Sequence, residues 1–527
     1  MNGTPILTIL TLLPLVGAVI VIGLGSDQRK LARGLSLAFS LLALVVAVIL
    51  WAHFDSKSGA LQFEEAHDWI PSLGVKYHLG ADGLSLVLVL LTAIVVPMSM
   101  LASWRVEERT QIYFALVLFL QAGLFGTFTA LNFFHWFLFW ELSLIPAFFL
   151  IRLWGGPGRR AAATQFFVYT MVGSVAMLLA FLAIFLCTAD GPGAAVDPAG
   201  RLDFSTLAEL GRNGRLENLF NVKLGWPFLS AKNLSLVIFG AAFLGFAVKV
   251  PLVPFHTWLP TTYAEAPTGT TMLLTGLMSK MGAYGFIRIL LPIFPGQIEA
   301  VLTPLLWLAV VTIVYSAGAA FAQRDLKRML GYSSINHLGY CLLGVFVLAR
   351  AATTDAAAID KAAALNGVIL QLFNHGLTAA TLFWFVGFLE QRTGVRGLND
   401  FGGLRKVAPV LCGLMGIALF SSLGLPGLNG FVGEFLIFRG VFPLSTWSAA
   451  LATLGLLITA VFILTLMQKV FHGPLNQRWA GFPDLSIGER AVLVPALVLM
   501  LVLGVYPQLI VGVINNTVVE MVRQMTM

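Results

Sequence analysis

Charged residues are scarce in this chain of 527 residues: Asp, Glu, Lys and Arg make up only 11% of it, whereas hydrophobic residues make up 58%. Soluble proteins carry charges at about a quarter of their positions. Apolar runs of about 20 residues, the length that crosses a bilayer core as a helix, recur from end to end. The composition therefore excludes a soluble multidomain enzyme and predicts an all-α polytopic membrane protein.

Cysteine is also rare, and the three cysteines stand singly in apolar stretches with no Cys-x-x-Cys pair. This spacing indicates no iron–sulfur cluster, zinc site or disulfide framework. No phosphate-binding loop is present, and no Gly-x-Gly-x-x-Gly follows a strand pattern. We therefore expect no cofactor and no metal in this chain. The cysteines are Cys187, Cys341 and Cys412.

The net charge of +7 does not indicate nucleic acid, because the basic residues are dispersed among short loops. Eighteen of them fall in one set of alternating loops and twelve in the other, and five of those twelve lie in the long segment 188–232. Since basic loops stay in the cytoplasm, we expect both termini on the periplasmic side of a bacterial inner membrane. The first apolar run, Ile6 to Leu24, predicts a membrane anchor rather than a removable signal peptide.

Hydropathy predicts about fourteen helices, with a polar, glycine-rich segment at 188–232 that is expected to form a small cap. The expected helices span roughly 5–25, 34–53, 82–103, 111–130, 132–151, 164–187, 233–252, 267–291, 300–322, 329–349, 363–389, 407–438 (interrupted), 447–469 and 491–515.

Two of these helices, the seventh and the twelfth, carry breaks. Lys249 stands two residues before Pro251, and Glu434 follows Pro426 and Gly430. Interrupted helices at matching places in two halves indicate an internal repeat around a midplane ion site. We therefore predict two inverted five-helix repeats. The expected parts are 1–110 with helices 1–3, 111–291 with helices 4–8, 292–470 with helices 9–13, and 471–527 with helix 14.

Four ionisable residues lie inside apolar runs, where each costs about 2.5–3.5 kcal/mol on insertion scales. Two histidines stand in similar surroundings, and histidine, lysine and glutamate all exchange protons when their partners move. The pattern predicts a proton relay, although buried ion pairs that only hold helices together remain an alternative. The six predicted proton-transfer residues are Glu141, Lys249, Lys280, His337, His375 and Glu434.

Weaker candidates lie at the ends of the helices. Asp82 precedes an apolar run and is expected to cap its helix. His256 and Glu265 stand near the cytoplasmic turn of the broken seventh helix, where a proton entrance is conceivable. The stretch "AQRDLKR" at 322–328 is expected to be a solvated loop that fixes the topology.

Several long motifs carry a resemblance to a known family. "WELSLIPAFFLI", "KVPLVPFHTWLP", "AEAPTGTTMLLTGLMSKMGAYGF", "DLKRMLGYSSINHLGY" and "LGLPGLNGFVGEF" resemble the antiporter-like membrane subunits of respiratory complex I and their cation/proton antiporter relatives. The resemblance covers nearly the whole chain, from about residue 70 to 515. It is greatest to the M-type branch, the counterpart of mitochondrial subunit 4, which carries a lysine matched by Lys280 and a glutamate matched by Glu434.

The resemblance assigns roles to the predicted relay. It implies that Glu141 and Lys249 form a coupled pair and that Glu434 is the exit-side group. The remaining members, Lys280, His337 and His375, would form the central polar axis. The chain departs from the family at residues 261–263, where Thr-Thr-Tyr replaces the usual Asp-Ala-His, so no histidine can act at Tyr263.

The function that the resemblance implies is proton translocation within an NADH:quinone oxidoreductase. NADH, FMN, iron–sulfur clusters and quinone would then belong to partner subunits, and L- and N-type subunits would be membrane neighbours. Two alternatives stay open. In the first, the chain is a subunit of a multisubunit Na+/H+ antiporter or of a membrane-bound hydrogenase. In the second, it is a structural spacer whose buried charges only join helices.

Overall fold

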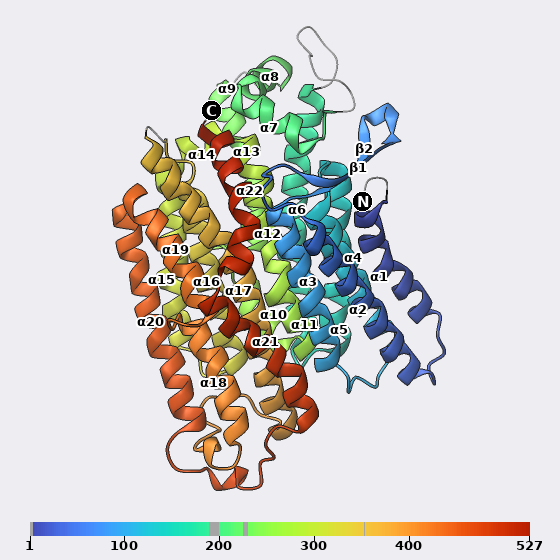
Figure 1. Cartoon of the computed structure of the whole chain (residues 1–527), viewed down its shortest axis with the longest axis vertical. Helices are drawn as coiled ribbons and strands as arrows, with labels where there is room; N and C mark the ends of the chain where they lie inside the picture. The colour runs from blue at the N-terminus through green and yellow to red at the C-terminus, as the bar shows by residue number, and fades with distance from the viewer. Residues whose placement is uncertain (1–3, 189–199, 225–229, 352–353, 527) are drawn as a thin grey trace.

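The computed structural model describes residues 4–188, 200–224, 230–351 and 354–526. It is a bundle of long helices that run side by side, with a hairpin and short helices gathered at one end (Figure 1). We call this end, which holds β1, β2, α7 and α8, the cap end, and we call the opposite end the loop end.

The first half of the chain contains six long helices before the cap segment. They are followed by two cap helices and then by a series of shorter pieces. The elements are α1 (Ile6–Ile22), α2 (Arg29–His53), β1 (Gln62–Ile70), η1 (Pro71–Leu73), β2 (Val75–Ala81), α3 (Gly83–Ala102), α4 (Thr110–Thr129), α5 (Phe133–Trp154), α6 (Arg159–Thr188), α7 (Phe204–Arg212), α8 (Arg215–Leu224), α9 (Ala231–Lys249), α10 (Trp258–Glu265), α11 (Thr268–Leu273), η3 (Leu274–Met278), α12 (Ser279–Gly285), η4 (Phe286–Leu290) and α13 (Leu291–Ile293).

The second half is built around one long central helix. Every residue of the apolar window of α17 is buried, so the other helices surround it on all sides. The elements are α14 (Pro295–Ala300), α15 (Leu302–Phe321), α16 (Leu326–Val347), α17 (Asp355–Thr393), η5 (Leu404–Lys406), α18 (Pro409–Leu423), α19 (Asn429–Leu444), α20 (Thr446–Phe471), η6 (Gln477–Trp479), α21 (Ile487–Val505) and α22 (Gln508–Thr526).

Ten of the described helices are long and apolar enough to cross a membrane, and α1 and α18 are shorter apolar helices. Their outer faces carry aliphatic side chains such as Val45, Val172 and Leu457, each more than half exposed. An apolar surface this continuous is normally covered by another apolar phase. The prediction of a polytopic helical membrane protein is therefore confirmed.

Side chains satisfy free backbone groups at the break after Lys249. Pro251 has no N–H to donate and ends α9 near this point. The indole of Trp258 donates to the carbonyl of Val248 at 3.0 Å, and the hydroxyl of Thr312 accepts from the N–H of Val253 at 3.1 Å. These bonds satisfy free backbone groups at the break, and the predicted interruption of this helix is confirmed.

The second break separates α18 from α19. Gly424 and Gly427 adopt φ angles of +80° and +92°, a region that favours glycine. The amide of Asn374 in α17 donates to the carbonyl of Asn429 at 2.7 Å, which anchors the start of α19. The predicted interruption within 407–438 is confirmed.

Two of the expected helices are wrong. The segment 267–291 is not one regular helix, because π-helical turns η3 and η4 flank α12. The segment 491–515 is split at Tyr506, since Pro507 cannot continue the hydrogen bonding of α21, and α22 then runs on to Thr526. The sequence analysis also did not predict that β1 and β2 pair as an antiparallel hairpin between α2 and α3.

The hairpin fastens the cap end to the bundle. The carboxylate of Glu65 in β1 accepts from the backbone N–H of Leu7 at 2.7 Å and so caps the start of α1, where the helix dipole favours negative charge. His78 in β2 contacts Asp203, the residue that caps α7, at 2.6 Å. These two contacts join three segments that lie far apart in the sequence.

The contact between His78 and Asp203 makes the docking of α7 depend on pH. The hydrogen bond with Asp203 raises the pKa of His78 above 6.5 more than burial lowers it. Burial raises the pKa of Asp203, but the bonds from His78 and Ser205 outweigh this and leave it below 3.8. The histidine therefore contributes stability below its unfolded pKa and loses it as pH rises through the raised value. The aspartate contributes above 3.8 and loses its contribution as pH falls through the lowered value.

We predict that amide hydrogen exchange in α7, corrected for intrinsic rates, is slowest in mildly acidic buffer and accelerates as pH rises through the pKa of His78. His78→Gln should remove this alkaline rise, because glutamine does not titrate. An identical pH course in the variant and the unchanged protein would contradict the prediction.

Candidate functional site

Four of the six predicted proton-transfer residues form one line that runs from α12 into the second half of the bundle. The amine of Lys280 in α12 lies 2.7 Å from Nδ1 of His375 in α17. The ring of His375 lies 5.2 Å, centroid to centroid, from the ring of His337 in α16. Nδ1 of His337 lies 2.8 Å from Oε1 of Glu434 in α19. All four side chains are buried, so the line is shielded from bulk water.

The amine of Lys280 has a full set of partners. Besides His375, it donates to the carbonyl of Thr275 at 2.6 Å and lies 3.4 Å from the hydroxyl of Ser279. A lysine ammonium has three donors and no acceptor. When Lys280 is charged, Nδ1 of His375 must therefore accept, which places the proton of the neutral imidazole on Nε2.

The π-helical turn η3 helps to place this amine. The side chain of Lys280 reaches back to the carbonyl of Thr275, five residues earlier and inside η3. Widened helical turns of this kind are rare and are often found at functional sites. Every residue of η3 except Gly276 continues the apolar or small-polar pattern of the segment, so hydropathy did not predict this turn.

Glu434 is held by two donors at one oxygen. Oε1 accepts from His337 and from the amide of Gln371 at 3.2 Å, while Nε2 of His337 lies 3.2 Å from the hydroxyl of Ser422. A side chain at Gly424 would bring a Cβ to 2.9 Å from Oε2 of Glu434. Glycine is therefore needed here both for its backbone angle and for the room that it leaves.

A groove of about 530 Å³ opens beside Glu434 between α19 and α20. Its lining is almost entirely apolar apart from this carboxylate, so Glu434 is the ionisable group that faces it. The lining residues are Leu423, Gly424, Phe431, Glu434, Phe435, Phe438, Phe442, Ala449, Ala450, Thr453 and Leu456.

Glu141 and Lys249 do not form a closed ion pair in this structure. The amine of Lys249 lies 4.7 Å from the ring centroid of Trp140, the residue next to Glu141, and it has no hydrogen-bond partner. Oε1 of Glu141 is also buried without a partner. The indole of Trp140 is fixed by a 2.9 Å bond to Ser174. The lysine is therefore stabilised by the face of an aromatic ring while the carboxylate stands nearby.

The two parts of the site meet where α9 packs against α12. A Cβ at Gly282 would lie 2.6 Å from Val250, which directly follows Lys249. The hydroxyl of Ser143 in α5 contacts the sulfur of Met281, which directly follows Lys280, at 3.5 Å. Helices α5, α9 and α12 therefore converge, although among the described residues no polar contact joins Lys249 to Lys280.

The weaker sequence candidates have different outcomes. Asp82 caps α3 through the N–H of Ser85, which confirms the prediction, and it also forms a buried ion pair with Arg288. His256 is buried beside Tyr315, with a ring-centroid distance of 5.3 Å, and neither of its ring nitrogens has a partner. Glu265 belongs to a network of charges at the loop end.

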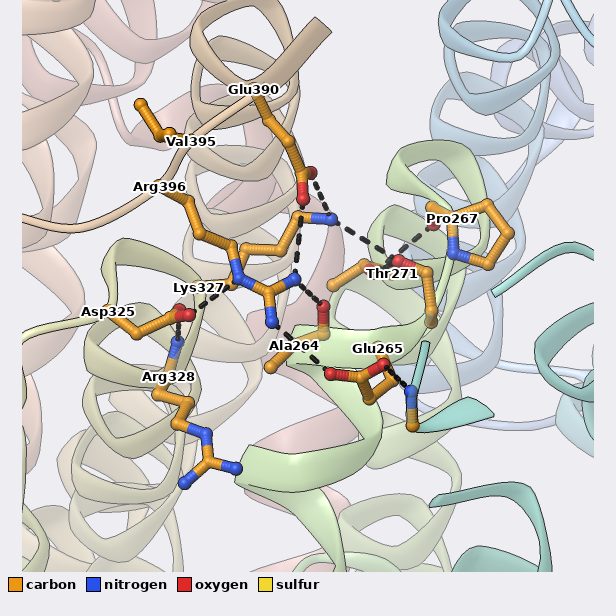
Figure 2. A network of polar contacts seen from close by, with 12 residues as sticks. Ala264, Glu265, Pro267, Thr271, Asp325, Lys327, Arg328, Glu390, Val395 and Arg396 are labelled. Carbon is orange, nitrogen blue, oxygen red and sulfur yellow. Dashed lines mark hydrogen bonds and ion pairs between the residues drawn. The ribbon is translucent and has the colours of Figure 1, made fainter. Parts of the chain in front are cut away.

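This network was missed by the sequence analysis (Figure 2). Arg396 contacts Asp325 at 2.5 Å, Glu265 at 3.2 Å and Glu390 at 3.3 Å, and so joins α10, the start of α16 and the end of α17. Burial alone would lower the pKa of Arg396, but the charges of Asp325 and Glu390 outweigh it and raise the pKa.

The expectation of a solvated loop at 322–328 is wrong for its central residues. Asp325 caps α16 by accepting from the N–H of Arg328, and Lys327 is buried in the first turn, 2.6 Å from Glu390. An aspartate that directly precedes an apolar run is a helix-start signal. Applied here, this signal would have placed Lys327 inside the helix.

No group of three or more His, Cys, Asp or Glu that could hold a metal ion occurs in the described part of the chain. The site instead consists of single proton-exchanging groups joined in a line. Hydrogen bonds join Lys280 to His375 and His337 to Glu434, and the two histidine rings lie beside each other between these pairs.

The contact between Lys280 and His375 depends on a close helix crossing at Gly376. A Cβ there would lie 2.6 Å from Leu91 and 2.8 Å from the carbonyl of Gly276. Because the backbone carbonyl cannot move aside, Gly376→Ala should separate α17 from η3 and lower stability by about 1–3 kcal/mol. Thermal unfolding in detergent measures this.

The control for this prediction is Gly318→Ala in α15, where an added Cβ meets no atom within 4 Å. It should be neutral or should raise stability by about 0.4–1 kcal/mol. Equal unfolding temperatures for the two variants would show that the crossing at Gly376 tolerates a methyl group.

Comparison with known proteins agrees with this architecture. The family described as "NADH:quinone oxidoreductase/Mrp antiporter, TM" matches residues 130–459, and "NADH-ubiquinone oxidoreductase chain 4, amino terminus" matches residues 10–127. NADH-quinone oxidoreductase subunit M of Rhodobacter capsulatus is 35% identical over 523 residues, which cover 98% of this chain and 96% of that protein. F(420)H(2) dehydrogenase subunit M of Methanosarcina mazei is 35% identical over 517 residues, 97% of each chain.

Solved structures share the fold over the whole length. A chain of respiratory complex I from Thermus thermophilus with bound NADH aligns with a TM-score of 0.81 at 29% identity and covers 98% of this chain and 99% of that one. A chain of the Mrp complex from a Dietzia species aligns with a TM-score of 0.82 at 19% identity and full coverage of both, a likeness of fold alone. The fold is thus that of antiporter-like membrane subunits.

Within that class the assignment is specific. The chain belongs to the NADH:quinone oxidoreductase/Mrp antiporter family and, inside it, to the M-type subunits of NADH:quinone oxidoreductase that correspond to chain 4.

Proposed function

We propose that this chain translocates protons as the M-type membrane subunit of an NADH:quinone oxidoreductase. The observation that carries the proposal is the line from Lys280 through His375 and His337 to Glu434, in which four helices each contribute one proton-exchanging group. Burying these groups in an apolar bundle is expensive, and residues of this kind inside membranes usually serve ion pathways.

Transfer along the line follows from the bonding of each group. Lys280 gives a proton to Nδ1 of His375, which can release its Nε2 proton on the other side of the ring. His337 then accepts a proton and passes one to Glu434 through the 2.8 Å contact. Histidine suits both central positions because its two ring nitrogens can accept on one side while releasing on the other.

The first half supplies the switch. Oε1 of Glu141 and the amine of Lys249 are both buried without a hydrogen-bond partner. The amine lies over the indole of Trp140, the residue that precedes Glu141 in the chain. A change in their separation alters how tightly Lys249 holds its proton, because a nearby carboxylate favours the charged amine. Charge movement in a neighbouring subunit would thereby start transfer toward Lys280.

The energy must come from partner subunits, because the relay itself contains only acid–base groups. NADH, FMN, iron–sulfur clusters and quinone would be bound there, and L- and N-type subunits would flank this chain in the membrane. The groove beside Glu434 supports an exit on the outer face of α19, where such a neighbour could approach.

The orientation and the repeats also belong to this proposal. The excess of basic residues in one set of loops supports an orientation with the loop end in the cytoplasm and both termini in the periplasm of a bacterial inner membrane. Residues 111–291 and 292–470 would form the two inverted repeats, each with a broken helix that carries one ionisable group of the relay. Lys249 and Glu434 are those groups.

Two other functions can be tested in one experiment on membranes that contain this chain. A subunit of a multisubunit Na+/H+ antiporter is favoured by the shared fold with the Mrp complex, and a related complex with another electron donor by the similarity to the F(420)H(2) dehydrogenase subunit. A native gel of mildly solubilised membranes, stained for NADH dehydrogenase activity, separates them. Migration of this chain away from that activity would contradict the proposal.

We predict that Lys249→Ala in the assembled complex lowers the number of protons moved per electron, because proton transfer without its base slows by about 100-fold or more. Glu141→Gln, which keeps the size of the side chain, should act in the same direction. Proton uptake and NADH oxidation are measured together in sealed vesicles.

Lys57→Ala is the matched control, since Lys57 is an exposed loop residue. It should leave the proton-to-electron ratio unchanged. If Lys249→Ala and Glu141→Gln behave like this control while assembly is normal, the buried charges serve only to hold the helices together.

A further inference from the structure

A cavity of about 270 Å³ at the cap end is lined by charged residues that the relay does not use. It lies between α13, α14, the residues 348–351 that follow α16, and the start of α17, and Met525 of α22 forms one wall. We propose that this cavity binds the headgroup of a membrane phospholipid that carries an amine. Lys361 and Arg350 hold its phosphate, and Glu299 holds its amine. The inference goes beyond the proposed proton translocation and does not depend on it.

Lys361 supplies the first observation. It stands in the second turn of α17, lines the cavity and is only 2% exposed. Among the described residues, its amine forms no hydrogen bond and no ion pair. Burying an ammonium is unfavourable unless a hydrogen-bonding partner of opposite charge offsets the lost hydration. An anion in the cavity supplies that partner.

Two further charges stand at the rim of the same cavity. Arg350 and Glu299 are both exposed, and both line it. The charge of Glu299 acts on Lys361 through space. In the described part of the chain, however, neither Glu299 nor Arg350 forms an ion pair with Lys361 or with any other residue. Two positive groups and one negative group therefore share one cavity without neutralising each other by contact.

This set of charges matches a phosphate ester that carries an amine. A guanidinium such as that of Arg350 can bind two phosphate oxygens at once, and a lysine binds phosphate as a point charge. The ammonium at the other end of the headgroup can then donate to the carboxylate of Glu299. Pockets for whole small-molecule ligands measure about 300–1,000 Å³. The cavity is slightly smaller and therefore suits a headgroup, with the acyl chains lying outside it.

A tryptophan pair relates the cavity to the surface of the membrane. The rings of Trp307 in α15 and Trp447 in α20 stack at 4.7 Å between centroids, and the two residues are 49% and 36% exposed. Exposed tryptophans in membrane proteins gather at the level of the lipid headgroups. Trp307 lies about 8 Å from the start of α15, at a rise of about 1.5 Å per residue. Since α14 directly precedes α15 at the cap end (Figure 1), the cavity lies near this level.

The other side chains of the lining favour a lipid over free phosphate. They are all apolar, so a hydrated inorganic phosphate gains nothing from them. The glycerol and first methylene groups of a lipid bury apolar surface against such walls, which is favourable. The phosphate in the cavity is therefore expected to belong to a lipid. These apolar residues are Leu291, Pro295, Leu348, Ala349, Ala351 and Met525.

The competing explanation is that the cavity holds only water and that Glu299 compensates the charge of Lys361 at a distance. Buried waters commonly complete the bonding of polar groups in cavities of sufficient size. The two explanations differ in what occupies the cavity within a membrane. Only the lipid explanation predicts that a phospholipid headgroup is held there and that this depends on the charges of Lys361 and Glu299.

The test uses the assembled complex in vesicles that contain phosphatidylethanolamine with a photoactivatable group on the first methylenes of one acyl chain. After illumination, lipid attached to peptides from α14 and from the start of α17 is measured by mass spectrometry. We expect Lys361→Gln to lower this labelling about tenfold, the factor that corresponds to the loss of one hydrogen bond to a charged group. Glu299→Gln should lower labelling by this lipid but not by a phosphatidylglycerol probe, which has no amine.

Lys57→Gln is the matched control, because Lys57 is an exposed cation in the segment between α2 and β1, outside the cavity. Equal labelling of Lys361→Gln and this control would show that the cavity holds no lipid headgroup. Displacement of the probe by free O-phosphoethanolamine as readily as by unlabelled lipid would overturn the assignment to a lipid. Should Lys361→Gln not assemble, Arg350→Gln at its exposed position, combined with Glu299→Gln, decides the question by the same criterion. None of these outcomes depends on proton pumping.

Discussion

The contact between Lys280 and His375 sets the geometry of the centre of this molecule. An ammonium in hydrocarbon must find partners within the protein, and Lys280 uses all three of its donors on His375, Thr275 and Ser279. This requires η3 to cross α17 closely, with Gly276 and Gly376 at the crossing, and it requires the π-helical turn itself to present the carbonyl of Thr275. Packing and backbone geometry in three elements thus follow from one buried amine.

The two broken helices differ in how they stabilise the interrupted backbone and the ionisable side chain at the break. At the first break, side chains from neighbouring helices satisfy the free backbone groups, and Lys249 is left against an aromatic ring without a hydrogen bond. At the second, glycines turn the chain and Glu434 receives two donors at one oxygen. The first break therefore holds a charge that can respond to a neighbour, while the carboxylate at the second break belongs to a line of groups that are already in contact.

The success of the sequence analysis depended on whether a feature has a local signal. The break within 407–438 was predicted because Pro426 and its glycines mark it, and the cap at Asp82 was predicted because an aspartate preceded an apolar run. The π-helical turns beside Lys280 were missed, since they interrupt neither the apolar pattern nor the chain. The hairpin at 62–81 was missed because its register shifts disturb the alternation of polar and apolar residues. Lys327 was assigned to a loop although Asp325 signals the start of its helix.

The sequence by itself determined that the chain crosses a membrane, which residues are ionisable within its apolar runs, and to which family it belongs. Hydropathy, proline and glycine positions and motifs are properties of neighbouring residues, so they can be recognised without coordinates. Only the tertiary structure decided that Lys280, His375, His337 and Glu434 touch in a line, that Glu141 and Lys249 stand apart, and that Lys327 is buried beside Glu390. Such contacts depend on how helices cross, because residues on different helices meet at distances that no spacing along the chain specifies.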